Sequence, residues 1–213
     1  MRPQRGCYHG QVKASSDLPP ACNRELPLRR AVSTVFLDRD GVLNQKMPEG
    51  CYVRSVEEFH LLPGVPQAIA ALNRAGLRVL VVSNQRGVSR GLYTPADVER
   101  IHAAFQQMLQ PCGARIDRFY FCPHGKNECA CRKPLAGMFE QARADFPEIA
   151  AEASLMIGDS LSDIEFGRRL GMRTILIAGN PADRKPGAET AAQLADLCRA
   201  SLAEAVDTLL SGL

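Results

Sequence analysis

Short runs of apolar residues recur along the chain, and each is followed by a segment with helical spacing. The runs lie at residues 32–37, 78–83, 118–122, 154–157 and 174–177. Strands whose sequence is apolar without interruption are covered on both faces. Strands that alternate with helices form a parallel sheet between helical layers. The pattern therefore predicts an open α/β fold, Rossmann-like, with a mainly parallel sheet and helices on both faces.

The segments between these runs fit helices. Thr94 to Asp97 predicts a helix start, because threonine caps helices, proline suits the first helical position and an acid favours the first turn. This helix is expected to end near Gln110, before Pro111. Further helices are expected over residues 66–75, 137–146, 163–170 and 203–210, with a short strand at 197–199.

Charge and periodicity divide the chain of 213 residues into two parts. Residues 1–30 carry six basic and two acidic residues, are rich in proline and show no sustained periodicity. We expect a flexible basic tail there and one folded domain over residues 31–213. The overall charge is +3, so +4 in the tail leaves −1 for the domain. A domain without a basic bias predicts no nucleic-acid partner.

The cysteines bear on the compartment. The beginning of the chain has no apolar core of a signal peptide, and nothing approaches the ~20 apolar residues of a membrane span. We therefore expect a cytoplasmic monomer with no membrane partner, in a reducing compartment where clustered cysteines bind metal. The remaining, scattered cysteines are expected to be free thiols: Cys7, Cys22, Cys51, Cys112 and Cys198.

Two carboxylates follow the first apolar run. Asp38 and Asp40 precede Gly41, a pattern that is also common in simple turns. In an open α/β sheet, however, the ligand crevice lies at the carboxyl ends of the strands. That position favours a functional role for both carboxylates.

Polar residues also follow the other runs. The second run ends in Ser83-Asn84-Gln85 before Arg86, which suits an anion but is also typical of a solvated loop. The fourth run leads into Asp159 and Asp163. Acids are common at helix starts for dipole reasons alone, so Asp163 is left open between a structural and a functional role.

The third run enters the sequence CPHGKNECACRKP at residues 122–134. Three cysteines and one histidine can give zinc a closed tetrahedral shell, which is typical of a structural site. Pro134 restricts Lys133 to an extended backbone. The sequence therefore predicts a short zinc-binding loop that presents Lys133. The predicted zinc ligands are Cys122, His124, Cys129 and Cys131.

Taken together, the strand-end motifs resemble the haloacid dehalogenase superfamily of phosphatases over residues 31–213. Within it, DRDG and the zinc loop before Arg-Lys-Pro resemble the branch that contains D-glycero-D-manno-heptose 1,7-bisphosphate phosphatase and histidinol-phosphate phosphatase. The segments VSNQRGVSRG and YVRSVEEFHLLPGV favour the heptose group. The motifs occur in the family's order: Asp38-x-Asp40-Gly41, Ser83-Asn84, Lys133-Pro134 and Gly158-Asp159-x3-Asp163.

The resemblance implies the chemistry of the site. Asp38 would form an aspartyl-phosphate, and Asp40 would act as acid and then base. Magnesium would be held by Asp38, the Asp40 carbonyl and Asp159. Ser83 and Lys133 would hold the phosphoryl group. The implied substrate-binding residues are Tyr52, Asn84, Gln85, Arg86 and Arg132.

The substrate expected from this resemblance is a small phosphorylated sugar, the 7-phosphate end of a heptose 1,7-bisphosphate. The number of cations in the matched motifs exceeds what one phosphate needs and would suit a second one: Arg86, Arg90, Arg132 and Lys133. The chain has no room for a large cap domain, only for a flap around residues 46–58.

Three further functions stay open. Histidinol phosphate has a cationic end and predicts nearby acids, for which Glu49, Glu57 and Glu58 are candidates. The chain departs from the heptose enzyme in two places: it has Ser160 where that enzyme has a lysine, and its zinc loop is shorter. These differences put the substrate in doubt. The second alternative is a phosphatase that acts on nucleic-acid ends. The third is a zinc-stapled binding module without catalytic activity.

Overall fold

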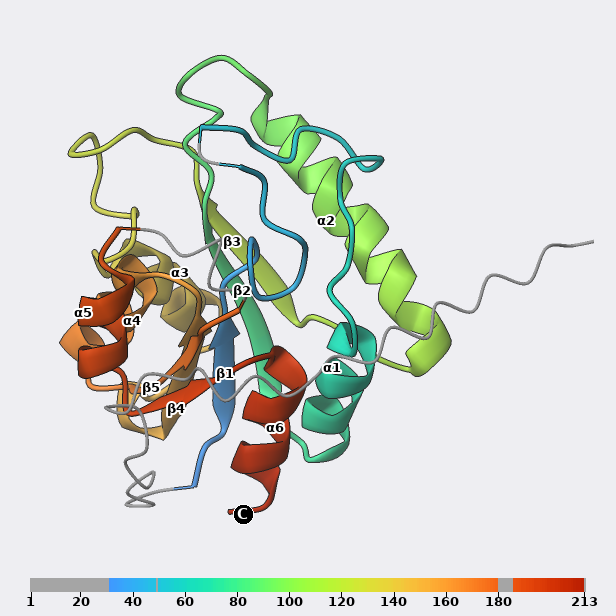
Figure 1. Ribbon diagram of the computed structural model, residues 1–213, viewed down its shortest axis with the longest axis vertical. Helices are drawn as coiled ribbons and strands as arrows, with labels where there is room; N and C mark the ends of the chain where they lie inside the picture. The colour runs from blue at the N-terminus through green and yellow to red at the C-terminus, as the bar shows by residue number, and fades with distance from the viewer. Residues whose placement is uncertain (1–30, 49, 180–185, 213) are drawn as a thin grey trace, which may run out of the picture.

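The strands form a parallel sheet in the structure, a computed structural model that describes residues 31–48, 50–179 and 186–212. Within these residues the sheet has six strands in the order β3-β2-β1-β4-β5-β6 (Figure 1). Every neighbouring pair is parallel, which confirms the predicted sheet. The strands are β1 Thr34–Leu37, β2 Arg78–Asn84, β3 Arg118–Cys122, β4 Ser154–Gly158, β5 Arg173–Ile177 and β6 Leu197–Arg199.

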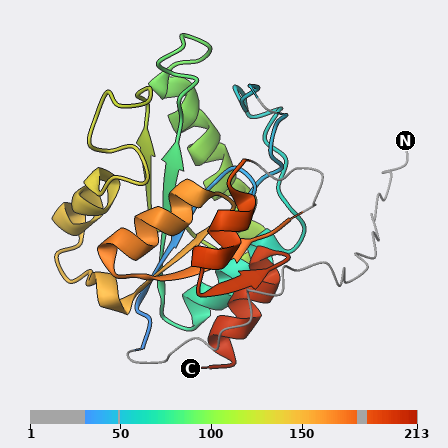
Figure 2. The same cartoon turned by 60° about the vertical axis from the view of Figure 1, so that its left-hand side comes forward.

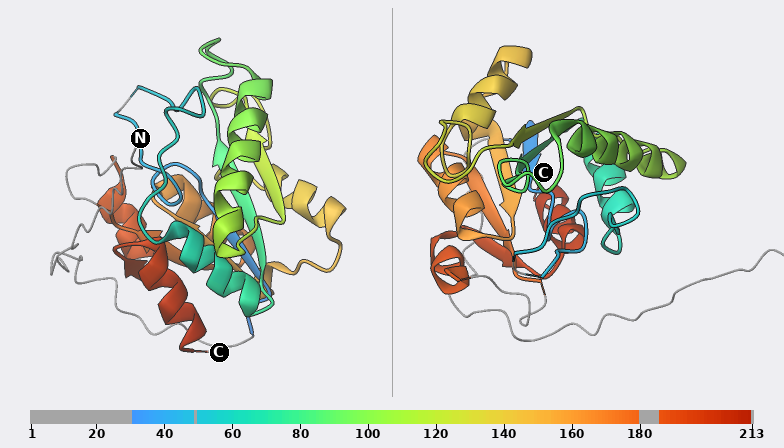
Figure 3. Two further views of the ribbon diagram at one scale, coloured as in Figure 1. Left: turned by 90° about the vertical axis from the view of Figure 1, so that its right-hand side faces the viewer. Right: turned by 90° about the horizontal axis from the view of Figure 1, so that it is seen from above.

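Helices cover both faces of this sheet (Figures 1 and 2). One face packs against α1, α2 and α6, and the other against α3, α4 and α5. Figure 3 shows α1 and α6 side by side on the first face. The helices are α1 Val65–Arg74, α2 Pro95–Leu109, α3 Gly137–Asp145, α4 Leu161–Leu170, α5 Ala188–Leu194 and α6 Leu202–Leu210. The prediction of helices on both faces is confirmed.

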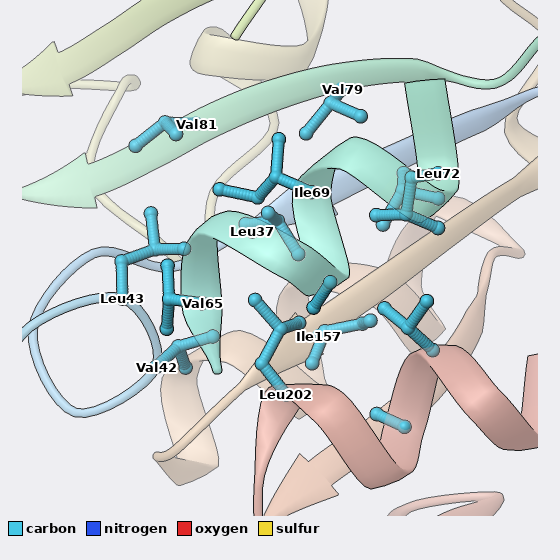
Figure 4. Close-up of a cluster of buried hydrophobic side chains, with 14 of the residues drawn as sticks. Leu37, Val42, Leu43, Val65, Ile69, Leu72, Val79, Val81, Ile157 and Leu202 are labelled. Carbon is cyan, nitrogen blue, oxygen red and sulfur yellow. The ribbon is translucent and has the colours of Figure 1, made fainter. Parts of the chain in front are cut away.

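Successive strand residues enter opposite halves of the core. Leu37 packs with Ile69 and Val81 in the cluster beneath α1 (Figure 4). Phe36, the preceding residue, belongs to the cluster beneath α3 with Met138. Because side chains alternate across a strand, two covered faces require apolar residues at every position. This explains the unbroken apolar runs.

Local signals placed α2 as expected. The Thr94 side chain accepts from the Asp97 amide, the Asp97 carboxylate accepts from the Thr94 amide, and Pro95 begins the helix. The helix gives way after Leu109 to a 3-10 turn over Gln110–Cys112. The helix α5 has no counterpart among the predicted elements.

The segment between β1 and α1 contains the flap, residues 46–58. Its described residues contain no helix or strand, although the bridge Asn44–Leu61 closes its base. Val53 and, just beyond, Phe59 are buried in the core cluster beneath α1. The prediction of a fold without a large cap domain is confirmed.

Several predictions concern the rest of the chain. The proposed tail, Cys7, Cys22 and Glu49 lie outside the described residues. Cys51 and Cys112 are free thiols, as expected. Cys198 is disulfide-bonded, so the prediction of a free thiol there is wrong. No helix among the described residues is long and apolar enough to cross a membrane.

Candidate active site

The order of the strands brings the predicted motifs together. Because β1 lies between β2 and β4, the residues after these three strands meet at one edge of the sheet. Leu37 is in register with Val81 and Ile157, and the Asp38 amide donates to the Ile157 carbonyl at 2.9 Å. The strand ends therefore place Asp38 at the centre of the edge.

A buried ammonium group joins two carboxylates at this edge. Lys133 Nζ lies 2.8 Å from Asp38 Oδ1 and 2.6 Å from Asp163 Oδ1. It also donates to the Val82 carbonyl at 2.6 Å. Burial favours neutral Lys133, but Asp163 and Asp38 together outweigh burial and raise the pKa of the ammonium. Lys133 is therefore charged in the site.

Asp38 responds differently to the same surroundings. Burial and the neighbouring Asp163 carboxylate raise the pKa of Asp38, while Lys133 opposes this shift. Only 8% of Asp38 is exposed. A carboxylate in this position gains from any further cation that enters the site.

The Lys133 backbone is held independently of its side chain. The Asn84 amide accepts from the Lys133 N–H at 3.0 Å and donates to the Lys133 carbonyl at 3.1 Å. Asn84 was predicted to bind substrate. In the structure both ends of its amide are engaged with Lys133, so Asn84 joins the end of β2 to the loop after β3.

Asp40 lies in a cage of donors. Arg39 is buried and binds both oxygens of this carboxylate. Asn44 and Gln85 each donate to it at 3.0 Å. Burial disfavours the charged carboxylate, but the Arg39 guanidinium and these hydrogen bonds outweigh burial, so the pKa of Asp40 is lowered.

Gln85 connects this cage to two further groups. Its Nε2 donates to Ser83 Oγ at 2.7 Å as well as to Asp40. Its Oε1 accepts from the Tyr93 hydroxyl at 2.8 Å and from Arg39 at 3.1 Å. Gln85 and Ser83 are both buried. The predicted phosphoryl ligand Ser83 is therefore hydrogen-bonded to the same amide as Asp40.

Oxygen ligands for a hard cation gather on the other side of Asp38. Asp38, Asp159 and Asp163 each offer a carboxylate oxygen within 4.8 Å of the others. Gly41 packs so closely here that a Cβ would lie 2.4 Å from Asp159 Oδ2. Asp163 is already bound to Lys133 and to Ser160. Asp38 and Asp159 thus fit the preference of magnesium for oxygen ligands.

The zinc ligands predicted from the sequence also converge. Cys129 Sγ lies 3.5 Å from Cys122 Sγ and 3.3 Å from Cys131 Sγ. His124 Nδ1 lies 3.3 Å from Cys131 Sγ. A tetrahedral zinc with Zn–S bonds of about 2.3 Å spans such separations. The chemistry and spacing of these four donors fit zinc.

The other predicted substrate residues lie around this centre. Tyr52, on the flap, packs 6.0 Å from the Tyr93 ring and beneath the Arg90 guanidinium at 5.9 Å. Arg132 donates to the His124 carbonyl at 3.3 Å. Arg86 is half-buried at the start of the loop after β2. The described contacts do not join these three to Asp38.

Sequence reasoning missed several residues of the site. Arg39 belongs to the DRDG motif, but neither its role nor that of Tyr93 can be predicted from the sequence, because both depend on where buried side chains point. Asn44 follows Asp40 by four residues in a tight turn, and this spacing is the one signal that could have revealed it. Lys46, which lies 2.6 Å from Asp159 Oδ2, was considered only as part of the flap.

Known proteins match this arrangement. A HAD-hydrolase-like family model matches residues 130–205. D-glycero-D-manno-heptose-1,7-bisphosphate 7-phosphatase of Chlorobaculum tepidum is 40% identical over 159 residues, covering 69% of this chain and 79% of the relative. D-glycero-beta-D-manno-heptose-1,7-bisphosphate 7-phosphatase of Escherichia coli is 35% identical over 188 residues, covering 81% and 96%.

A solved structure is similar as well. The D,D-heptose 1,7-bisphosphate phosphatase of B. bronchiseptica, complexed with magnesium and phosphate, superposes with a TM-score of 0.75 at 33% identity. The match covers 85% of this chain and 100% of that one. Together with the sequence relatives, it establishes that the chain belongs to the haloacid dehalogenase-like hydrolases, among their phosphatases.

Proposed function

We propose that the protein is a magnesium-dependent phosphatase that removes the 7-phosphate of D-glycero-D-manno-heptose 1,7-bisphosphate. The observation that carries the proposal is the meeting of three groups at one sheet edge. The Lys133 ammonium lies 2.8 Å from Asp38, and Asp159 offers an oxygen beside them. The heptose phosphatases named above give the substrate class.

In the first step an Asp38 oxygen attacks the phosphorus and forms an O–P bond. The bond from phosphorus to the sugar oxygen breaks, its electron pair stays on that oxygen, and Asp40 supplies the proton. Because Arg39 and the hydrogen bonds around it lower the pKa of Asp40, the carboxylate takes up this proton before the step, when the phosphate dianion enters beside it. Lys133 and Ser83 hold the phosphoryl oxygens. Splitting hydrolysis through a covalent intermediate replaces one difficult step with two easier ones.

In the second step water attacks the same phosphorus. Asp40 takes the proton of the water, the bond from phosphorus to Asp38 breaks, and its electrons return to the carboxylate. Phosphate leaves and the starting protonation of Asp40 is restored. One carboxyl group thus serves as acid and then as base.

Magnesium would be held by Asp38, Asp159 and the Asp40 carbonyl. When bound, it offsets the repulsion between the phosphate dianion and the carboxylates. Zinc would be held by Cys122, His124, Cys129 and Cys131 and would be structural, since four protein ligands close its shell.

The substrate assignment rests on charge and access. Arg86 and Arg90 follow β2, Arg132 follows β3, and these cations suit a second phosphate, while a flap without a cap domain suits a small sugar. Histidinol phosphate is the second candidate. Its cationic end would need a nearby acid, but the Glu58 carboxylate is already bound to Arg54 and Glu57 is exposed.

We also propose that residues 31–213 form the phosphatase domain, that residues 1–30 are a flexible tail and that the protein works as a monomer.

The test is a substrate panel with an inactive variant. Purified protein is assayed with both anomers of the heptose 1,7-bisphosphate, with histidinol phosphate and with a 5′-phosphorylated oligonucleotide. We expect a bisphosphate to give the highest kcat/KM. Asp38→Asn should lower kcat at least about 1,000-fold, because the nucleophile is lost.

Two results would contradict the proposal. A preference for histidinol phosphate by orders of magnitude would overturn the substrate. Turnover by Asp38→Asn close to that of the parent would overturn the nucleophile. Unchanged zinc content and circular dichroism in Asp38→Asn serve as the control for an intact fold.

A further inference from the structure

We infer that Gln85 is a positioning residue for the acid–base carboxylate of Asp40, and that it does not contact the substrate. The inference rests on the proposed function, in which Asp40 donates a proton to the leaving oxygen. The resemblance to known phosphatases implied substrate binding for Gln85. The hydrogen bonds of its side chain point to a different role.

The amide of Gln85 is fully used within the protein. Nε2 has two hydrogens, and they go to Asp40 Oδ2 at 3.0 Å and to Ser83 Oγ at 2.7 Å. Oε1 has two lone pairs, and they accept from Arg39 and Tyr93. An amide offers two donors and two acceptor sites, so none is left for a ligand. Only 1% of Gln85 is exposed.

These bonds fix the direction in which Asp40 points. Arg39 and Asn44 bind the carboxylate at Oδ1, and Gln85 binds it at Oδ2 beside Arg39. The Asp40 side chain is still 29% exposed, so the protein does not enclose it completely. A carboxyl group held on its protein side transfers a proton in one defined direction.

The same amide couples Asp40 to Ser83. Ser83 is buried at the end of β2 and accepts from Gln85, so its own hydrogen is available to a phosphoryl oxygen. Ser83 lies within β2, in register with Phe121, so the sheet holds it without Gln85. Gln85 is therefore needed for the direction of Asp40 and not for the place of Ser83. Gln85 itself exchanges no proton.

The test uses substrates that differ in their need for an acid. A sugar alkoxide is a poor leaving group and requires the proton of Asp40, whereas an aryl oxide such as p-nitrophenolate leaves without it. The ratio kcat/KM reports steps up to loss of the leaving group. Gln85→Leu should lower kcat/KM about 10- to 100-fold for the heptose bisphosphate, a part of what acid catalysis supplies. For p-nitrophenyl phosphate we expect a loss below about threefold.

A binding measurement separates positioning from substrate contact. Affinity for the heptose bisphosphate is measured by calorimetry in Asp38→Asn and in Asp38→Asn/Gln85→Leu, with magnesium present. We expect the two dissociation constants to agree within about twofold. A loss of affinity that matches the loss of kcat/KM would make Gln85 a substrate contact and overturn the inference.

Tyr93→Phe provides a second variant if Gln85→Leu does not fold. It removes one hydroxyl hydrogen bond to Gln85 Oε1 and should give the same selective loss, smaller in size. Equal losses for the sugar and aryl substrates in a folded variant would contradict positioning of the acid. Turnover by Asp38→Asn, in contrast, would contradict the proposed function and leave the geometry of Gln85 unexplained.

Discussion

The ammonium group of Lys133 illustrates how this site keeps a buried charge. Lys133 lies in the loop after β3, and its ammonium group forms ion pairs with both Asp38 and Asp163. A buried ion is tolerated when it is paired and hydrogen-bonded, and Lys133 has both kinds of partner. Removing Lys133 would leave Asp38 and Asp163 facing each other. Substitution here therefore perturbs the fold as well as the chemistry.

His102, on α2, predicts an acid-sensitive contribution to stability. Its ring is buried and stacked on Phe119 at 4.5 Å, and burial, with help from Arg39, lowers the pKa of His102 from 6.5 to about 3. The unfolded chain therefore binds one proton more between these two pH values. The contribution of neutral His102 to the free energy of unfolding is therefore fully present above pH 6.5. It falls by about 1.4 kcal/mol per pH unit as the pH decreases toward 3.

Urea unfolding of the parent and of His102→Phe measures this term. Between pH 6.5 and 5 the parent should lose about 2 kcal/mol more of its unfolding free energy than the variant. His102 Nε2 makes no hydrogen bond to the described residues, so phenylalanine gives up no partner there. Identical pH slopes in the two proteins would show that His102 is not neutral in the folded state.

Residues of the site differ in how far the sequence predicts them. Asp38, Ser83 and Asp159 were predicted because they follow apolar strands, and parallel strands bring such residues to one edge. The roles of Asn84 and Gln85 were not predictable in the same way. Their neighbours along the chain do not determine which distant partners their amides reach, since Arg39 and Asp40 follow β1 and Lys133 follows β3.

At the scale of elements, the flap is tied to the metal ligands. Lys46 Nζ forms an ion pair with Asp159 Oδ2 at 2.6 Å, and both side chains are largely shielded from solvent. Gly41 lies so close to this pair that a Cβ there would meet the Asp159 carboxylate. A divalent cation bound to Asp159 would repel the Lys46 ammonium, because two cations at short range share one carboxylate.

Replacement of Lys46 should therefore strengthen magnesium binding. In Lys46→Met, calorimetric titration of the substrate-free protein should give a dissociation constant for magnesium about tenfold lower than in the parent. Hydrogen exchange of the flap should rise in the parent on addition of magnesium and should already be high in Lys46→Met.

Arg143→Gln is the matched control for this variant. It removes one positive charge from an exposed position in the last turn of α3, and its affinity for magnesium should stay close to that of the parent. Equal or weaker magnesium binding by Lys46→Met would mean that the Lys46–Asp159 pair does not compete with the metal.

Elements differ in predictability for a physical reason. The helix α2 was predicted closely, because its cap, its proline and its apolar face act locally. The helix α5 was missed: its sequence AETAAQL is short and carries few large apolar side chains. It is stabilised by packing against α4, with Ala191 and Ala192 fully buried. Such tertiary stabilisation leaves little trace in local sequence.

At the scale of the whole molecule, the fold and the zinc loop are separate sources of order. The larger core cluster lies beneath α1, α2 and α6 and contains none of the zinc ligands. The cluster beneath α3 includes Cys122, with Cys129 and Cys131 packed against it. A domain of this length buries enough surface to fold without a metal. Zinc should therefore order one edge of the molecule and not the molecule as a whole.

Removal of zinc tests how the catalytic lysine is held. Lys133 has two tethers, the zinc loop that precedes it and the Asn84 amide that binds its backbone. With zinc removed by a chelator and magnesium restored, we expect kcat to fall about tenfold, because Asn84 remains. Asn84→Ala with zinc bound should lose a similar factor.

Both tethers hold the same lysine, so the two fold-losses of kcat should not simply multiply. Once both are gone, Lys133 has no backbone constraint at the crevice, and kcat should fall well beyond the product of the single losses. The free energy of unfolding of the zinc-free parent should change little, because the larger cluster is untouched. Full activity of zinc-free Asn84→Ala would mean that the pairing of Lys133 with Asp38 and Asp163 is enough to hold it.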